Sequence, residues 1–466
     1  MLSWNALLLG HEKHEMQTKP VAIIGAGLAG LTTARFLKQR QIPFVLYEAG
    51  SQVAGMAKSF RDDEGFSYDF GAHFITNRLA SALGVGASCR LVRHYGETVA
   101  LDGRHYGYPF GLLAVPRYVM SAVAAHLDSS TSLAQSAADS MRQLYGRVMA
   151  EEIAIPLIEA WSGENANTLS SAVVEKLPSG VLKTMMLKVA ARVMGRAIAI
   201  GYSREAPETT SVWHVYPESG LGSMLEAVAA PVRDEIKLNS PAEAIYVENE
   251  RAVGVRSAGV DQEVAAVVST APCNVLPKLV RGTNKLEHLR RFRYRAMIFV
   301  NLRLRGRNLL RDTVVWTPEP QFPFFRLTEA PVSMPWLAPS DKTIITADLG
   351  CQVGDESWKS SDEALVEKCI SALDPFIPSV RQQVIGARVL RTPIAYPVFH
   401  LDYEAQRQAF KQSTDIAGLY SIGRNGEFEH ILMEDVYWRT LKKCRQLARY
   451  ITEGVPSRVL DARLSA

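Results

Sequence analysis

Residues 20–50 read PVAIIGAGLAGLTTARFLKQRQIPFVLYEAG, and this stretch decides the fold. Residues 21–24 are apolar and β-branched, as in a strand that is buried on both faces. Residues 31–39 predict a helix and residues 44–47 a second strand. Between the first strand and the helix lies the pattern GxGxxG, formed by Gly25, Gly27 and Gly30. The stretch is therefore one complete βαβ unit.

This unit has the features that a dinucleotide site needs. The first glycine permits the tight turn, the second lets the backbone approach a pyrophosphate, and the third lets the helix pack closely on the strand. The helix N-terminus offers free N–H groups and the positive end of its dipole to phosphates. Glu48 ends the second strand, where its carboxylate can accept hydrogen bonds from a ribose diol. The pattern predicts a bound dinucleotide, but GxGxxG does not say which one.

The amino-acid composition limits the class of protein and the kinds of partner to expect. The chain has 466 residues, 47% of them hydrophobic and 21% charged, as expected for a packed protein of two to four structural units. A formal net charge of +4 gives no strong argument for a nucleic-acid partner. Five scattered cysteines without a CxxC pair predict no disulfide framework and no metal site, which fits a reducing, cytoplasmic setting. We expect neither a signal peptide nor a transmembrane helix.

The rest of the chain alternates between helical and strand patterns. Residues 130–154 predict a helix, with Pro156 as a stop or kink just beyond it. Short strands are predicted at residues 243–255, 263–269, 301–304, 343–349 and 419–422, and further helices at 361–373 and 433–451. A strand, a glycine-containing turn and a long helix follow one another again near the C-terminus, as in the first unit. The pattern therefore predicts a discontinuous dinucleotide domain with a second domain inserted into it.

Three further stretches identify a family. They are AGSQVAGMAKSF at 49–60, GFSYDFGAHFITN at 65–77 and GRNGEFEHILMED at 423–435. Together with the GxGxxG unit they resemble the FAD-binding pattern of the flavin amine oxidase superfamily. Within it they are most similar to protoporphyrinogen-oxidase-like proteins and to UDP-galactopyranose mutases. Stretches at 160–170, 215–227 and 324–333 also look like their family counterparts, so the likeness spans most of the chain.

The resemblance implies FAD as the cofactor and assigns residues to it. Glu48 would meet the adenosine ribose, Ala242 the adenine, Arg424 the ribityl-phosphate end, and Met433 and Glu434 the isoalloxazine. The full implied set is Gly25, Gly27, Leu28, Ala29, Gly30, Glu48, Ala49, Gly55, Met56, Ala57, Gly71, Ala72, His73, Ala242, Gly423, Arg424, Met433 and Glu434. The side-chain chemistry of Arg424 agrees with this role, since a guanidinium can pair with a phosphate through two hydrogen bonds.

The sequence also departs from the family pattern. The usual Arg-Val-Gly-Gly is here Gln-Val-Ala-Gly at residues 52–55, which removes one expected phosphate contact. The usual Tyr-x-Asn/Asp before the methionine is here His-Ile-Leu at residues 430–432. Nothing matches the lysine or the aromatic cage of simple amine oxidases, which disfavours that activity.

His73 and Arg326 are the candidate catalytic residues. In the mutase-like branch, the loop that GAHFITN resembles lies against the flavin. A neutral imidazole at His73 can accept a proton, and a charged one can stabilise an anionic reduced flavin; the alternative is a structural histidine bonded to nearby backbone. Arg326 lies in an apolar run and so needs a partner. That partner is either Glu329, three residues on, or an anionic substrate group.

Residues 178–201 predict a basic amphipathic helix. Apolar residues follow helical spacing and basic residues recur every four positions, namely Leu182, Met186, Val189 and Val193, and Lys188, Arg192 and Arg196. Three interpretations stay open. The helix rests on a membrane surface, flanks the entrance for an apolar or anionic substrate, or packs on the core with a solvated charged face.

These observations predict an α/β protein with a Rossmann-like FAD-binding domain of the glutathione-reductase type and a second, α+β substrate domain. The predicted FAD-binding segments are 18–92, 213–285 and 401–466, and the predicted substrate segments are 93–212 and 286–400. The leading function is an FAD-dependent oxidoreductase that takes a hydride from a C–N or C–C bond of a small molecule. The alternatives are a mutase-like isomerase that uses reduced FAD on a nucleotide sugar, and a non-catalytic flavin-binding protein.

Overall fold

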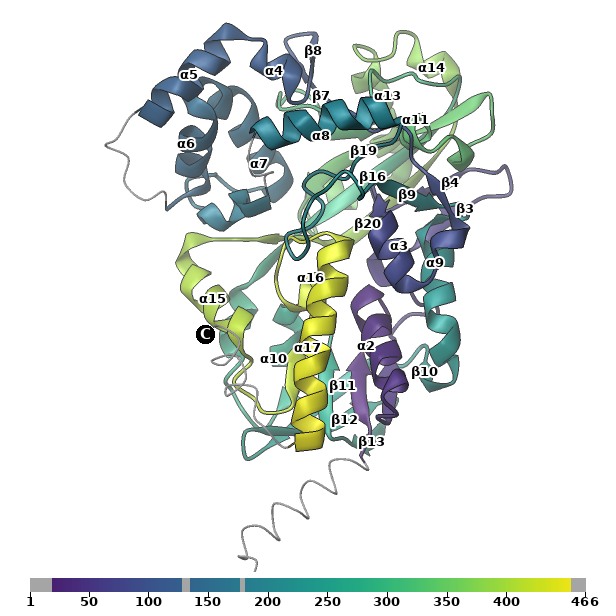
Figure 1. Cartoon of the computed structure of the whole chain (residues 1–466), viewed down its shortest axis with the longest axis vertical. Helices are drawn as coiled ribbons and strands as arrows, with labels where there is room; N and C mark the ends of the chain where they lie inside the picture. The colour runs from purple at the N-terminus through teal and green to yellow at the C-terminus, as the bar shows by residue number, and fades with distance from the viewer. Residues whose placement is uncertain (1–18, 128–134, 177–180, 454–466) are drawn as a thin grey trace, which may run out of the picture.

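The computed structural model describes residues 19–127, 135–176 and 181–453, which form two lobes along the long axis (Figure 1). Parts of four sequence predictions lie outside these residues. They are residue 18 of the first predicted segment, 130–134 and 178–180 of two predicted helices, and 454–466 of the last segment.

The lower lobe in Figure 1 is built on a five-stranded parallel sheet of order β10–β2–β1–β14–β21. Its strands are β1 (Val21–Ile24), β2 (Phe44–Tyr47), β10 (Ile236–Lys237), β14 (Ala266–Ser269) and β21 (Leu419–Ser421). The central strand has no polar face because both its faces are covered. Val21 and Ile23 pack into one core cluster, and Ala22 and Ile24 pack into another.

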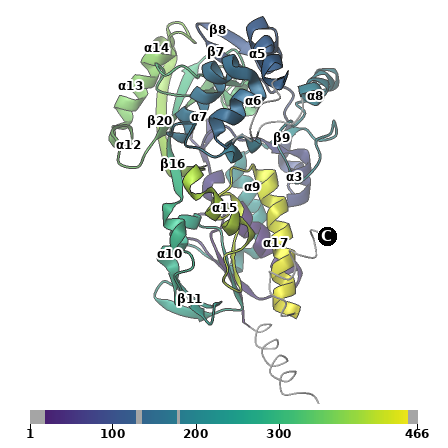
Figure 2. The same cartoon turned by 90° about the vertical axis from the view of Figure 1, so that its left-hand side faces the viewer.

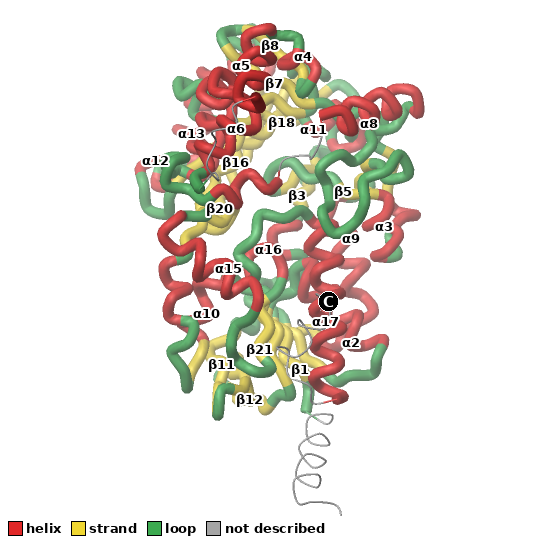
Figure 3. The backbone as a smooth tube through the Cα atoms, turned by 60° about the vertical axis from the view of Figure 1, so that its left-hand side comes forward, coloured by secondary structure: helices red, strands yellow, loops and turns green. Residues whose placement is uncertain are grey.

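Two layers cover this sheet. Helices α2 (Leu28–Gln39) and α17 (Met433–Glu453) lie side by side on one face, although they come from opposite ends of the chain (Figures 1 and 3). The other face packs on a four-stranded sheet of order β13–β12–β11–β15. Its strands are β11 (Ala242–Glu248), β12 (Arg251–Ser257), β13 (Val260–Glu263) and β15 (Val280–Arg281). The predicted discontinuous, Rossmann-like domain of an α/β protein is confirmed.

The upper lobe contains a seven-stranded mixed sheet of order β20–β16–β19–β18–β17–β7–β8. Its strands are β7 (Glu97–Leu101), β8 (Arg104–Gly107), β16 (Arg293–Arg305), β17 (Val314–Trp316), β18 (Arg326–Thr328), β19 (Lys342–Cys351) and β20 (Val384–Val398). Figure 2 shows one group of helices on each side of it. They are α12 (Glu356–Lys359), α13 (Asp362–Leu373) and α14 (Val380–Gln383) on one side, and α5 (Pro116–Leu127), α6 (Ala137–Met149) and α7 (Ile155–Ser162) on the other.

Shorter elements complete the two lobes and the connections between them. A hairpin of β3 and β4 and a three-stranded sheet of order β5–β9–β6 are the strands among them. The shorter elements are η1 (Gly55–Ala57), β3 (Ser59–Arg61), β4 (Ser67–Asp69), β5 (Ile75–Thr76), α3 (Asn77–Leu83), η2 (Gly86–Ser88), β6 (Cys89–Leu91), α4 (Phe110–Leu113), η4 (Ser171–Lys176), α8 (Val181–Met194), β9 (His214–Pro217), α9 (Gly220–Ala229), η5 (Ala230–Glu235), η6 (Cys273–Val275), α10 (Leu276–Leu279), η7 (Glu287–Arg291), α11 (Ala330–Ser333), η8 (Pro335–Leu337), η9 (Leu401–Tyr403), α15 (Glu404–Gln412) and α16 (Gly423–Gly426). The domain boundaries stay a prediction.

The structure corrects two sequence predictions about elements. Pro156 neither stops nor ends the helical run, because α6 passes through a π-helical turn, η3 (Ala150–Ala154), into α7. Pro156 is the second residue of α7 and follows the π-helical turn directly. The strand predicted at 301–304 is only the C-terminal part of β16, which has 13 residues. Arginines near both ends of this strand hid its length in the sequence.

The amphipathic helix predicted at 178–201 is α8, and its apolar stripe does not face the core. Met186, Val189 and Val193 are 65%, 57% and 83% exposed. Lys188 instead points inward and donates a hydrogen bond to the Tyr108 carbonyl at 2.9 Å. The apolar stripe is thus exposed, although Thr184 and Leu187 on another face of the same helix are buried. Packing on the core, contact with a membrane and contact with an apolar substrate all stay predictions. None of the helices in the described part of the chain is both long and apolar enough to cross a bilayer.

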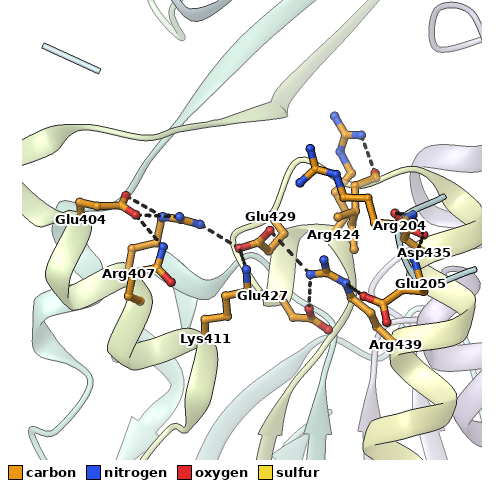
Figure 4. Close-up of polar contacts among 12 residues, drawn as sticks. Arg204, Glu205, Glu404, Arg407, Lys411, Arg424, Glu427, Glu429, Asp435 and Arg439 are labelled. Carbon is orange, nitrogen blue, oxygen red and sulfur yellow. Dashed lines mark hydrogen bonds and ion pairs between the residues drawn. The ribbon is translucent and has the colours of Figure 1, made fainter. Parts of the chain in front are cut away.

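A buried ion network joins α15 to the loop before α17 (Figure 4). Arg407 is 1% exposed and donates to both carboxylate oxygens of Glu404 and to Glu429, each at 2.8 Å. Glu429 also pairs with Lys411 at 3.1 Å and Arg439 at 3.6 Å. Because Arg407 pairs with two carboxylates at once, removing its charge would leave Glu404 without this cation and Glu429 with only Lys411 and Arg439.

Arg407→Met tests this network. The substitution keeps most of the buried volume but leaves the two acids without their shared guanidinium, so we expect the free energy of unfolding to fall by about 3 kcal/mol in urea denaturation. Lys411→Met is the matched control. Lys411 is 30% exposed and pairs only at the edge of the network, so its loss should cost about 1 kcal/mol or less. Equal losses for the two variants would contradict the central role of Arg407.

Candidate active site

The carboxyl ends of the parallel strands meet at one edge of the lower sheet, where ligands of such sheets bind. Here the Gly25 N–H donates to the Tyr47 carbonyl at 2.7 Å, which closes the turn after β1. Glu48, one residue beyond β2, accepts the Ala26 N–H at 2.7 Å and the Gly50 N–H at 2.8 Å. These two bonds hold the carboxylate beside the glycine turn, and its remaining lone pairs can accept ribose hydroxyls.

The glycines of the turn have different tasks. A Cβ on Gly30 would lie 1.9 Å from the Gly25 carbonyl oxygen, so only glycine lets α2 approach β1 this closely. A Cβ on Gly27 would meet nothing within 4 Å, so this position is open. Gly423 packs against α2 from the C-terminal segment, because its Cβ would lie 2.9 Å from that of Ala29. The three positions enclose the N-terminus of α2, which no side chain caps.

The departure at residues 52–55 has a structural consequence. Ala54 adopts φ 89° and ψ −19°, a left-handed conformation that glycine adopts more easily than alanine. Its N–H donates to the Ala26 carbonyl at 2.9 Å, so the loop lies against the glycine turn. A Cβ on Gly55 would lie 3.4 Å from the Cα of Gly27. The loop therefore holds Ala54 in a conformation that strains its backbone.

The remaining residues of the implied cofactor set are placed as follows. Ala242 begins β11 next to Glu48, since the Ser240 N–H donates to the Glu48 carbonyl at 2.8 Å. Met433 begins α17, and the Glu434 carboxylate is bound by Thr76 at 2.9 Å and by Arg78. That carboxylate is thus committed to protein partners. Leu28, Ala29 and Ala57 are buried, and Ala49 and Met56 are exposed near the turn.

Arg424 is a cation without an acidic partner among the described residues. Its guanidinium donates to the carbonyls of Ile431 at 3.0 Å and Ala395 at 3.1 Å and lies 5.3 Å from the Tyr396 ring centroid. Burial lowers the pKa of this guanidinium. Tyr396 also packs with Trp161 and with His430 in one aromatic group. A buried cation bonded only to neutral carbonyls suits an anionic ligand.

Arg326 has a different partner from the one weighed in the sequence. It forms an ion pair with Asp348, the residue directly opposite on the neighbouring antiparallel strand. Glu329 is not the partner, because it accepts the Leu310 N–H at 2.7 Å and the Thr343 hydroxyl at 2.8 Å. Residues three apart along a strand point to opposite faces, which explains the error. Although burial opposes the charge, Asp348 raises the pKa of the Arg326 guanidinium.

His73 lies beside this ion pair, on the loop between β4 and β5. A Cβ on Gly71 in the same loop would lie 3.2 Å from Arg326 Nη2 and 3.7 Å from Asp348 Oδ2. Burial, together with the positive charges of Arg424 and Arg326, lowers the pKa of His73 to about 4. Its imidazole is therefore neutral at physiological pH. Loop residues 71–73 thus lie beside the Arg326–Asp348 pair, and all three also line a small pocket.

Sequence reasoning missed several residues of this pocket. Asp348 reaches it only through strand pairing, and no local signal marks it. Asp69 stands two residues before Gly71 in the family motif and could have been noticed there.

A second group surrounds His214, whose ring centroid lies 4.2 Å from that of Tyr202 and 5.4 Å from those of Phe74 and Tyr95. Burial lowers the pKa of His214 to about 3, so it is a neutral core residue.

The residues present fit FAD. The uncapped helix N-terminus and the open face at Gly27 suit a pyrophosphate, the Glu48 carboxylate suits a ribose diol, and Arg424 suits a further anionic group.

Comparison with known proteins also indicates a flavin-binding protein. The model of the family described as flavin-containing amine oxidoreductases matches residues 28–436. The FAD-dependent monooxygenase aptC of Emericella nidulans is 55% identical over 47 residues, 10% of this chain and 11% of that protein. Such matches cover 11% to 24% of the curated relatives' length.

Two solved structures share the whole fold. The structure of reduced UDP-galactopyranose mutase has a TM-score of 0.75 at 18% identity and covers 94% of both chains. A protein of Exiguobacterium sp. 255-15 assigned as a protoporphyrinogen oxidase has a TM-score of 0.71 at 17% identity, covering 93% of this chain and 99% of its own.

The pair Gly27→Ala and Gly30→Ala separates cofactor contact from folding. Gly27→Ala meets no protein atom, so we expect a normal melting temperature for the flavin-free protein but FAD binding weakened about tenfold or more. Gly30→Ala clashes with a backbone oxygen, so we expect it to lower both the melting temperature and flavin content. Isothermal titration with FAD and thermal melts of the flavin-free proteins measure both. Unchanged FAD affinity in Gly27→Ala would contradict the placement of the pyrophosphate.

Ala54→Gly tests the strain in the second loop. Glycine adopts the left-handed conformation without a Cβ clash, so we expect the free energy of unfolding to rise by about 0.5–1 kcal/mol in urea denaturation. Ala57→Gly, in the same loop but in the ordinary helical region, should lower it by about 0.5–1 kcal/mol. A loss of stability in both variants would rule out strain at Ala54.

Proposed function

This chain belongs to the flavin-containing amine oxidoreductases, and on that premise we propose that it takes a hydride from a C–N or C–C bond of a small-molecule substrate. Membership confirms the resemblance drawn from the motifs, and the cofactor is FAD. When bound, FAD would supply the electron acceptor for this hydride. The observation that carries the proposal is that the loop at 71–73 brings neutral His73 against the Arg326–Asp348 pair.

His73 accepts the proton that the substrate releases. With a pKa lowered to about 4, its imidazole is neutral throughout the physiological range and can act as a general base. Its Nδ1 has no hydrogen-bond partner among the described residues, which leaves the ring without a competing backbone bond at that atom. The structural-histidine interpretation, which requires such a bond, is less well supported at Nδ1.

Arg326 binds and orients the substrate. Asp348 keeps the guanidinium charged in a pocket where only 14% of the Arg326 side chain is exposed. Arg326 Nε is buried without a hydrogen-bond partner in the described chain, so this donor is available to a carbonyl, carboxylate or phosphate oxygen of a substrate. Because the ion pair spans two strands, the donor is held at a fixed position relative to His73.

A mutase-like isomerase is the second candidate. The positive charges of Arg424 and Arg326 both lower the pKa of His73, so two cations lie in its electrostatic environment. Two guanidinium groups against one buried carboxylate suit the diphosphate of a nucleotide sugar. In that case the reaction would involve no net change in oxidation state of the substrate.

An anaerobic visible spectrum of the purified protein tests these functions. We expect a flavin band that persists with NADPH and bleaches with a primary amine such as benzylamine or with a partly reduced tetrapyrrole such as protoporphyrinogen IX. Prompt bleaching by NADPH alone would favour the mutase-like reaction. Absence of a flavin band even after addition of FAD would overturn both.

His73→Gln should slow the substrate-driven bleaching about 100-fold if the imidazole is the general base. His105→Gln is the matched control, because His105 lies on β8 at the far edge of the upper sheet and packs on Phe376. It should leave the rate unchanged. Stopped-flow absorbance in the flavin band measures both variants, and a normal rate in His73→Gln would exclude His73 as the base.

A further inference from the structure

We propose that Asp69 is the positioning residue of His73, and that the two side chains share one proton across a small cavity that both line. The inference rests on the proposed role of His73 as proton acceptor. Asp69 ends β4, and its carboxylate Oδ2 lies 3.8 Å from His73 Nδ1. This distance is too long for a direct hydrogen bond and short enough for one bridging water.

Two hydroxyl donors bind the buried Asp69 carboxylate. It is 7% exposed, accepts the Ser59 hydroxyl at 2.6 Å on Oδ1, and accepts the Tyr216 hydroxyl on Oδ2. These two donors fix the orientation of the carboxylate and stabilise its charged form. Neither donor is used by the cofactor set, so the arrangement serves the carboxylate itself.

Helix α9 polarises these donors from its N-terminus. The Gly222 N–H donates to the Ser59 hydroxyl oxygen at 3.0 Å. Gly220 permits the approach, because a Cβ there would lie 2.7 Å from Ser59 Oγ. The positive end of the helix dipole therefore acts through Ser59 on the buried Asp69 carboxylate.

The cavity between Asp69 and His73 can hold a water molecule. It has a volume of about 20 Å³, enough for one water, and its lining includes both residues together with Ser67, Tyr216 and Thr328. Ser67 Oγ, His73 Nδ1 and Thr328 Oγ1 are buried polar atoms without a hydrogen-bond partner among the described residues. Together with the Asp69 carboxylate they provide the two to four partners that a buried water requires.

The charges around the pair favour the proton on Asp69. Burial raises the pKa of Asp69 to about 6, against the bonds from Ser59 and Tyr216. Burial and the cations Arg424 and Arg326 lower that of His73 to about 4, while Asp348 balances Arg326. A proton that reaches His73 therefore passes to Asp69. An imidazolium N–H bond breaks, a carboxyl O–H bond forms, the bridging water relays the proton, and no oxidation state changes.

This transfer returns His73 to its neutral form after it has accepted a proton from the substrate. Without Asp69 the proton would stay on an imidazole that faces two guanidinium groups. The pair thus gives the pocket a place for the proton that is shielded from solvent, because Asp69 is buried.

Histidine ring ¹⁵N NMR of the full-length, FAD-loaded protein tests the pair without measuring activity. The chain has 10 histidines, and His73→Gln identifies the His73 signals. In the wild type we expect the His73 shifts to change with a midpoint near pH 6, as Asp69 gains its proton while the imidazole stays neutral. Asp69→Asn should abolish that midpoint. Persistence of the midpoint in Asp69→Asn, or its absence in the wild type, would overturn the proposal.

Tyr216→Phe provides a second variant in which the carboxylate is kept. Loss of the hydroxyl donor removes a bond to the charged form, so the midpoint should move to higher pH. An unmoved midpoint would show that Asp69 is not the group being titrated. This variant keeps the test decisive if Asp69→Asn does not fold.

Asp312→Asn is the matched control, because His94 and Asp312 form a second, more exposed histidine–aspartate pair at 2.8 Å. Asp312 raises the pKa of His94, so the substitution should lower that of His94 and leave the His73 midpoint in place. A normal bleaching rate in His73→Gln together with the expected NMR midpoint would refute the general-base role alone. A missing midpoint would refute the Asp69 pair alone.

Discussion

The close approach of helix α2 to strand β1 at Gly30 is the contact on which the rest of the structure depends. Because no Cβ intervenes, the helix N-terminus reaches the carboxyl edge of the sheet. Gly423 from the C-terminal segment then packs on Ala29, and α17 packs along α2. A segment from each end of the chain is thereby fastened to the same helix. The upper lobe is formed by residues between α2 and α17 in the sequence, and it contributes residues to the site at the carboxyl edge of the lower sheet.

Buried charge is handled in three ways in this molecule, and the differences carry information. Arg407 is neutralised by Glu404 and Glu429 and serves the structure (Figure 4). Arg326 is neutralised by Asp348 but keeps a free donor atom, Nε. Arg424 has only carbonyl partners among the described residues. Burying a charge is unfavourable unless it is paired. The arginine with the most acidic partners therefore suits a structural role, and the arginine without an acidic partner suits ligand binding.

The pocket at the 71–73 loop is assembled from segments that are distant in the chain. Loop 71–73 follows β4 in the lobe connection, Arg326 and Asp348 come from the upper sheet, and Arg424 comes from the C-terminal segment. The electrostatic coupling among these groups therefore depends on both lobes at once. Such dependence explains why the pocket has strongly shifted pKa values although each contributing segment is unremarkable in composition.

The sequence by itself determined the βαβ unit, its glycines, Glu48, the discontinuous α/β layout and the family. These features follow from local patterns, since strand, turn and helix preferences act over a few residues and the flavin motifs are contiguous. The tertiary structure alone decided that Asp348 and not Glu329 pairs with Arg326, that Asp69 meets Tyr216, and that the apolar stripe of α8 faces solvent. Such contacts arise from strand register and lobe packing between distant residues, which no local pattern records.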